Sequence, residues 1–120
     1  MDKEKRRILA VSNEPSVLER LNDILKNIFP NSEVILQTDP LMACKYSFEN
    51  EVDYAFATEK MKRMCGIDLL RFIKKDNPEA KTYLVYEENA FSVRPYEDYD
   101  GMVLYPLTFE KMAEVLKVHK

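Results

Sequence analysis

Five short apolar runs alternate with stretches of helical periodicity along this chain of 120 residues. The first run, residues 8–11, is continuously apolar, as expected of a strand that is buried on both faces of a parallel sheet. Similar runs follow at residues 34–36, 52–57, 83–85 and 102–104. The pattern therefore predicts five strands, each separated from the next by a helix or a long connection.

The clearest helical pattern lies between the first two predicted strands. Pro15 stands where a helix can begin, because the first turn does not need its missing N–H, and Pro30 ends the segment. Between them, apolar residues recur at spacings of three and four, which predicts one buried helix face. The residues of that face are Val17, Leu18, Leu21, Ile24, Leu25 and Ile28.

Three further segments have helical patterns. One begins at Asp39 and Pro40, one follows Gly66, and one is capped by Thr108. We predict that they bury, in order, Leu41, Cys44 and Phe48; Ile67, Leu69, Leu70 and Ile73; and Phe109, Met112, Val115 and Leu116. The segment 89–100 has poor periodicity and contains Pro95, which predicts a shortened or irregular fourth helix.

Alternating strands and helices of this length predict one α/β domain spanning residues 1–120. Right-handed crossovers give a doubly wound, five-stranded parallel sheet with a flavodoxin-like strand order. In such folds the ligand crevice lies beyond the carboxyl ends of the strands.

Composition excludes several classes of function. A net charge of −3 with scattered basic residues gives no concentrated nucleic-acid-binding face. No apolar run approaches the roughly 20 residues of a membrane span, and the charged start is unlike a signal peptide, so we expect a cytoplasmic protein. Cys44 and Cys65 make neither a disulfide framework nor a zinc site, and we expect both to be packing residues.

Several landmarks along the chain resemble the receiver domain of two-component response regulators. Residues 8–15 are similar to its first strand and acidic loop, and Met61 and Gly66 have the spacing of its third-strand region. Tyr105 and Pro106 are similar to a lysine–proline step after the fifth strand. The resemblance implies a site with two carboxylates and a phosphoacceptor aspartate that hold Mg²⁺, together with a small hydroxyl residue and a lysine.

This sequence departs from that chemistry at each position. The acidic pair falls on Ser12 and Asn13, the acceptor on Thr58, the small hydroxyl position on Tyr86 and the lysine position on Tyr105. These departures agree with one another in charge, because the carboxylates that would hold the metal and the lysine that would balance their charge are both missing. We therefore expect a degenerate site with no metal, no cofactor and no catalytic group.

The two tyrosines have two interpretations. Tyr86 and Tyr105 either fill the old pocket with their rings or form a recognition surface with Thr58 and Ser12. Thr58 itself is expected to cap a backbone turn, because a threonine hydroxyl is a poor nucleophile without an adjacent base. Glu14 and Glu59 could together attract a divalent ion, but two carboxylates make a weak site, and we expect both to be solvated acidic loop residues.

Two more features concern the stretch between the last two predicted strands and the turn after them. Tyr96, Tyr99 and Met102 either form a contact patch or cover the irregular helix. The bond between Tyr105 and Pro106 is predicted to be cis, as the resemblance implies.

These features predict a pseudo-receiver, a phosphorylation-independent signalling module that binds a protein partner and is not an enzyme. The partner is a signalling component or an attached effector domain, and a homodimer is a further candidate. One alternative is a phosphorelay receiver with non-standard chemistry at Thr58 or Glu59. Another is a small-molecule-binding flavodoxin-like protein, although the loop 12–16 has no glycine to receive a phosphate.

Overall fold

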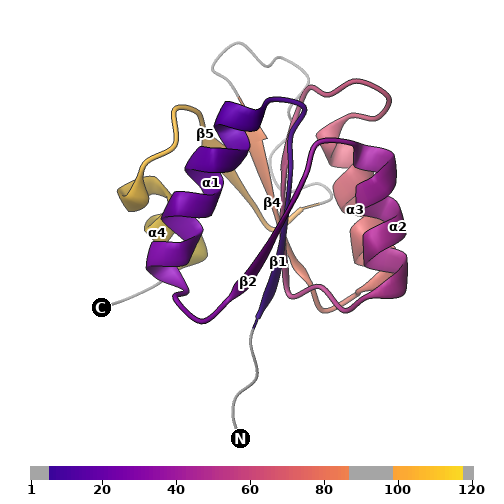
Figure 1. The fold of residues 1–120 in the computed structure, drawn as a ribbon, viewed down its shortest axis with the longest axis horizontal. Helices are drawn as coiled ribbons and strands as arrows, with labels where there is room; N and C mark the ends of the chain where they lie inside the picture. Colours follow the sequence, from indigo (N-terminus) through magenta and orange to yellow (C-terminus); the bar gives the residue numbers. More distant parts are fainter. Residues whose placement is uncertain (1–5, 87–98, 118–120) are drawn as a thin grey trace, which may run out of the picture.

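The fold is a single five-stranded parallel sheet with helices on both faces (Figure 1). The structure is a computed structural model that describes residues 6–86 and 99–117. The strand order is β2-β1-β3-β4-β5, which confirms the predicted flavodoxin-like arrangement. The strands are β1 (Arg7–Val11), β2 (Glu33–Gln37), β3 (Tyr54–Thr58), β4 (Lys81–Tyr86) and β5 (Gly101–Leu104).

Four helices in the described part of the chain divide between the two faces of the sheet (Figure 1). α1 (Pro15–Ile28) and α4 (Phe109–Leu116) cover one face, and α2 (Pro40–Glu49) and α3 (Gly66–Asp76) cover the other. Each pair of helices encloses its own cluster of buried apolar residues. The irregular helix expected between β4 and β5 falls largely on residues 87–98, which lie outside the described residues.

α1 forms as its periodicity predicts. Its buried residues are Val17, Leu18, Leu21, Ile24 and Leu25, and Ile28 packs against the same cluster from a half-buried position. Pro15 occupies the first turn, and the N–H of Phe29 donates to the carbonyl of Leu25 to close the last turn. None of the helices in the described part of the chain has the length and apolarity that a membrane crossing requires.

The predicted buried face of α2 is wrong by one residue in phase. Leu41 and Phe48 are 45% and 77% exposed, and Cys44 is half-buried. The buried residues are instead Pro40, Ala43 and Ser47. Both sets have the same helical spacing, and packing against α3 selects the smaller side chains. The Ser47 carbonyl accepts from the Asn77 side chain at 3.0 Å, an approach that a large side chain at this position would obstruct.

Two other local predictions differ from the structure. Phe109 was expected to face inward but is 44% exposed, whereas Met112 is fully buried as expected. The third strand begins at Tyr54 and not at Val52, because the N–H of Val52 donates to the side chain of Asn77 instead of entering the sheet. Thr108 caps α4 as predicted, since its hydroxyl accepts the N–H of Lys111.

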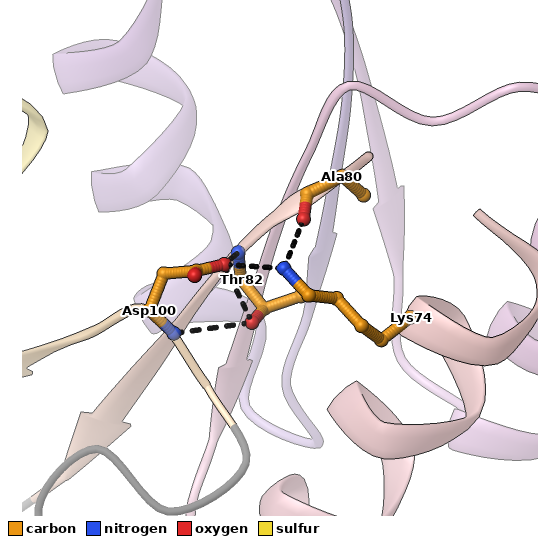
Figure 2. A network of polar contacts seen from close by, with 4 residues as sticks. All are labelled: Lys74, Ala80, Thr82 and Asp100. Carbon is orange, nitrogen blue, oxygen red and sulfur yellow. Dashed lines mark hydrogen bonds and ion pairs between the residues drawn. The ribbon is translucent and has the colours of Figure 1, made fainter. Parts of the chain in front are cut away.

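A polar network ties α3 to the amino ends of β4 and β5 (Figure 2). The ammonium of Lys74 donates to Asp100 at 2.7 Å and to the carbonyl of Ala80 at 2.6 Å. The same carboxylate oxygen of Asp100 accepts the backbone N–H of Thr82 at 2.8 Å. Burial alone would raise the pKa of Asp100, but the Lys74 hydrogen bond, the Thr82 N–H and the Lys74 charge together lower it.

We expect the contribution of Asp100 to stability to be lost in acid. Because its folded pKa lies below the ordinary value of 3.8 for an aspartate, the ionised carboxylate stabilises the fold above that pH. The advantage declines as the pH falls below 3.8 and through the lower folded pKa. Thermal unfolding of the protein and of Asp100→Asn should therefore differ at neutral pH and converge in acid. A difference that stayed constant down to acid pH would show that the charge of Asp100 is not what stabilises this corner.

Candidate functional site

The carboxyl ends of β1, β3, β4 and β5 border a cleft of about 810 Å³. Because parallel strands end at the same edge of a sheet, residues from four separate loops meet there. All five positions singled out in the sequence line the cleft: Ser12, Asn13, Thr58, Tyr86 and Tyr105. The structure adds Val17, Lys60, Lys62, Cys65 and Val85 to the walls, alongside Glu14, Glu59 and Met61.

Ser12 and Asn13 serve the backbone of the surrounding loops. The buried hydroxyl of Ser12 accepts the N–H of Glu14 at 3.2 Å and so orders the turn into α1. The side-chain amide of Asn13 donates to the carbonyl of Thr38 at 2.8 Å. Its oxygen accepts the N–H of Lys62. Both side chains are therefore engaged in local structure.

Thr58 is the last residue of β3, and its backbone carbonyl lies very close to Gly66 at the start of α3. A Cβ on Gly66 would lie 2.1 Å from the Thr58 carbonyl oxygen, so only glycine permits α3 to begin here. Among the described residues, the Thr58 hydroxyl is closed off from solvent and has no hydrogen-bond partner. The expectation that Thr58 caps a turn is therefore wrong, because its hydroxyl receives no backbone N–H.

Tyr86 and Tyr105 stand next to each other on the wall of the cleft. The N–H of Tyr105 donates to the carbonyl of Tyr86 at 2.8 Å, which extends the pairing of β4 with β5. Both side chains are half-buried, and Tyr105 packs against the cluster under α1 and α4. The expectation that they fill the pocket holds only in part, because the cleft they line remains open within the described structure.

The turn that follows Tyr105 is held by long basic side chains. The bond from Tyr105 to Pro106 is cis, the conformation predicted for it. The ammonium of Lys111 donates to the carbonyls of Leu104 at 3.2 Å and Pro106 at 2.9 Å. Arg20 reaches across from α1 and donates to the carbonyl of Leu107 at 3.1 Å. These contacts fix the β5–α4 loop against the rest of the site.

The charges in the cleft do not suit a divalent cation. Mg²⁺ and Ca²⁺ prefer several carboxylate oxygens, and no group of three histidine, cysteine or acidic residues occurs in the described ranges 6–86 and 99–117. Glu14 is exposed as expected, whereas Glu59 is buried, which corrects the expectation of a solvated Glu59. Lys60 and Lys62 line the same cleft and would repel a metal ion.

Other residues predicted from the sequence lie apart from a binding surface. Tyr99 is only 6% exposed, and its hydroxyl contacts the sulfur of the half-buried Met102 at 3.4 Å. These two residues therefore belong to the core cluster beneath α3. The predicted contact patch of Tyr96, Tyr99 and Met102 is wrong for Tyr99 and Met102, and Tyr96 lies outside the described residues. Both cysteines were expected to be packing residues, and Cys44 packs against the core, whereas Cys65 is an exposed residue of the cleft.

Solved structures with the same arrangement of strands and helices are numerous. A signal receiver domain of an HD domain-containing protein from Pseudomonas fluorescens Pf-5 superposes with a TM-score of 0.82 at 18% identity, covering 95% of this chain and 93% of that chain. A response regulator receiver domain protein from Clostridium thermocellum gives 0.76 at 20% identity, with 93% and 91% covered. This chain has the fold of a response-regulator receiver domain.

A third neighbour shows the chemistry that such a fold can carry. A response regulator protein from Burkholderia pseudomallei, solved with a phosphorylated aspartic acid, a calcium ion and citrate, gives a TM-score of 0.75 at 11% identity. The match covers 95% of this chain and 68% of that one. The sequence itself matches no family profile and no curated protein. The fold is thus shown by shape, while the site residues must be interpreted from their own chemistry.

Proposed function

We propose that this receiver-like domain is a phosphorylation-independent signalling module that binds a protein partner and catalyses no reaction. The observation that carries this proposal is the lack of charge at the strand-end positions where receiver chemistry requires it. Those positions hold Ser12, Asn13, Thr58, Tyr86 and Tyr105, and all of them line the cleft. Without a carboxylate cage the cleft offers no metal to neutralise an incoming phosphoryl group, and no lysine directly follows β5; the two lysines that line the cleft, Lys60 and Lys62, are exposed residues of the β3–α3 loop.

The state of Thr58 argues against an unorthodox phosphoacceptor. A hydroxyl becomes a useful nucleophile when a base removes its proton. The Thr58 oxygen has no hydrogen-bond partner among the described residues and is closed off from solvent, so a phosphodonor would have to displace its surroundings first. The neighbouring residue Glu59 is also buried, with only 7% of its surface exposed. Both candidates for non-standard phosphorelay chemistry are therefore poorly placed.

Binding fits the site better than catalysis does. The cleft joins apolar side chains, including Val17, Met61 and Val85, to hydroxyl and charged groups at its rim. Apolar area with a few polar groups is the usual composition of a recognition site. The partner would be a signalling component or an effector domain attached to this one, and one fixed conformation would suffice for such constitutive docking.

The decisive test is intact-mass spectrometry after incubation with acetyl phosphate and Mg²⁺. We expect no mass increase of one phosphoryl group, either in the protein or in a Thr58→Ala variant. The reason is that the cleft does not combine an activated nucleophile with a metal site that could balance the charge of a phosphoryl group. An increase that is absent from Thr58→Ala would overturn the proposal and identify Thr58 as the acceptor. An increase retained in that variant would overturn it as well and direct the search to Glu59.

A further inference from the structure

The side chain of Asn13 connects three loops at the mouth of the cleft. It leaves the β1–α1 loop, donates to the carbonyl of Thr38 in the β2–α2 loop and accepts the N–H of Lys62 in the β3–α3 loop. The two partners are 25 and 49 residues away in the sequence. One half-buried amide therefore links three separate segments.

An amide can make both of these bonds, whereas the ionised carboxylate of the same size cannot. An asparagine side chain has an NH₂ donor and a carbonyl acceptor, whereas an ionised aspartate only accepts. A carboxylate at position 13 could still accept the N–H of Lys62. Against the carbonyl of Thr38, however, it would place two acceptors face to face. The neutral residue at this position is thus matched to a specific pair of backbone partners.

The β3–α3 loop is fastened at further points. At its start, the N–H of Glu59 donates to the carbonyl of Val85 at 2.8 Å, and at its end the N–H of Gly66 donates to the carbonyl of Glu59 at 2.9 Å. Between these ends, Arg63 has a positive φ of 79° and its guanidinium lies 3.9 Å from the carboxylate of Asp39. A non-glycine residue adopts this backbone region only when its surroundings hold it there.

We propose that the Asn13 amide holds the loops of this cleft in one arrangement without any divalent cation. The described residues include no group of three histidine, cysteine or acidic side chains that could hold a metal, and the side-chain oxygen at position 13 already accepts the N–H of Lys62. The cleft is consequently preformed, and its shape does not depend on a ligand. This inference concerns the same cleft as the proposed function and rests on it, but the two are tested by different measurements.

The test is amide hydrogen exchange of the full chain, measured with Mg²⁺ and with EDTA. In the wild type we expect the same exchange rates in residues 59–64 under both conditions. In Asn13→Ala the Lys62 N–H loses its acceptor and should exchange about tenfold faster, as expected when a hydrogen bond worth about 1.4 kcal/mol is removed. The amides of β1 and β3 should remain protected, which separates loosening of the loop from unfolding.

The substitution Asn13→Asp tests the two hydrogen bonds of the amide separately. It keeps an acceptor for Lys62 and removes the donor to Thr38, so we expect the Lys62 N–H to stay protected while exchange rises in residues 38–41. Asn31→Asp is the matched control, since Asn31 is exposed and the same charge is added there. It should leave both segments unchanged.

Three outcomes would overturn the inference. The first is a loop whose exchange slows when Mg²⁺ is added to the wild type, since a metal and not the amide would then order it. The second is an Asn13→Ala variant whose Lys62 amide exchanges as slowly as before. The third is an Asn13→Asp variant that matches the wild type in both segments. None of these would by itself show that the protein accepts phosphate, which the mass measurement decides separately.

Discussion

Gly66→Ala is expected to lower the free energy of unfolding by about 3 kcal/mol and to distort the cleft. The added methyl would lie 2.1 Å from the carbonyl oxygen of Thr58 and 3.0 Å from the side chain of Leu84. The carbonyl cannot move aside easily, because β3 is paired on both sides and the next residue, Glu59, is bonded to Val85. Alanine favours a helix over glycine by about 1 kcal/mol, which is too little to offset the contact.

Thermal or denaturant unfolding measures this effect, and a loss of about 3 kcal/mol corresponds to roughly 10 °C in the midpoint for a domain of this size. Cys65→Ala is the matched control. Cys65 is the exposed neighbour of Gly66, and its side chain makes no capping hydrogen bond to α3. The control should change stability by less than about 0.5 kcal/mol. A Gly66→Ala protein as stable as this control would mean that α3 can start without the close approach.

Phe56→Ala is expected to cost about 3–5 kcal/mol, because it removes a large side chain from the centre of the cluster under α1 and α4. Phe56 is fully buried, and its ring stacks on that of Tyr83 with centroids 5.1 Å apart. Tyr83 also stacks on Tyr54 at 6.4 Å. Burial, followed by the neighbouring Tyr54 and Asp100, raises the pKa of Tyr83 to about 12, as expected of a phenol within a largely dry cluster.

The same substitution at Phe48 provides the control for this prediction. Phe48 is 77% exposed on α2, so Phe48→Ala should change the free energy of unfolding by less than about 0.5 kcal/mol. Denaturant unfolding of both variants compares one chemical change in two environments. Equal losses at the two positions would contradict the observed phase of α2, and a small loss at Phe56 would contradict its place at the centre of the core.

Much of the site could be predicted from the sequence because a parallel sheet brings the ends of its strands to one edge. Once residues 8–11, 52–57, 83–85 and 102–104 are taken as strands, the residues that follow them must meet there. For that reason Ser12, Asn13, Thr58, Tyr86 and Tyr105 could be assigned to one site before any contact was known. Their bonding could not, because the partners of Asn13 lie on two other loops.

The sequence by itself determined the order of the elements, the buried face of α1 and the neutral character of the strand-end positions. These depend on local spacing and residue type, which periodicity reports directly. The tertiary structure alone decided that α2 turns Ala43 and Ser47 inward and leaves Phe48 exposed, and that Tyr99 is buried. Helical spacing limits a short helix to a few rotations, and the choice among them depends on which side chains let a neighbouring helix approach.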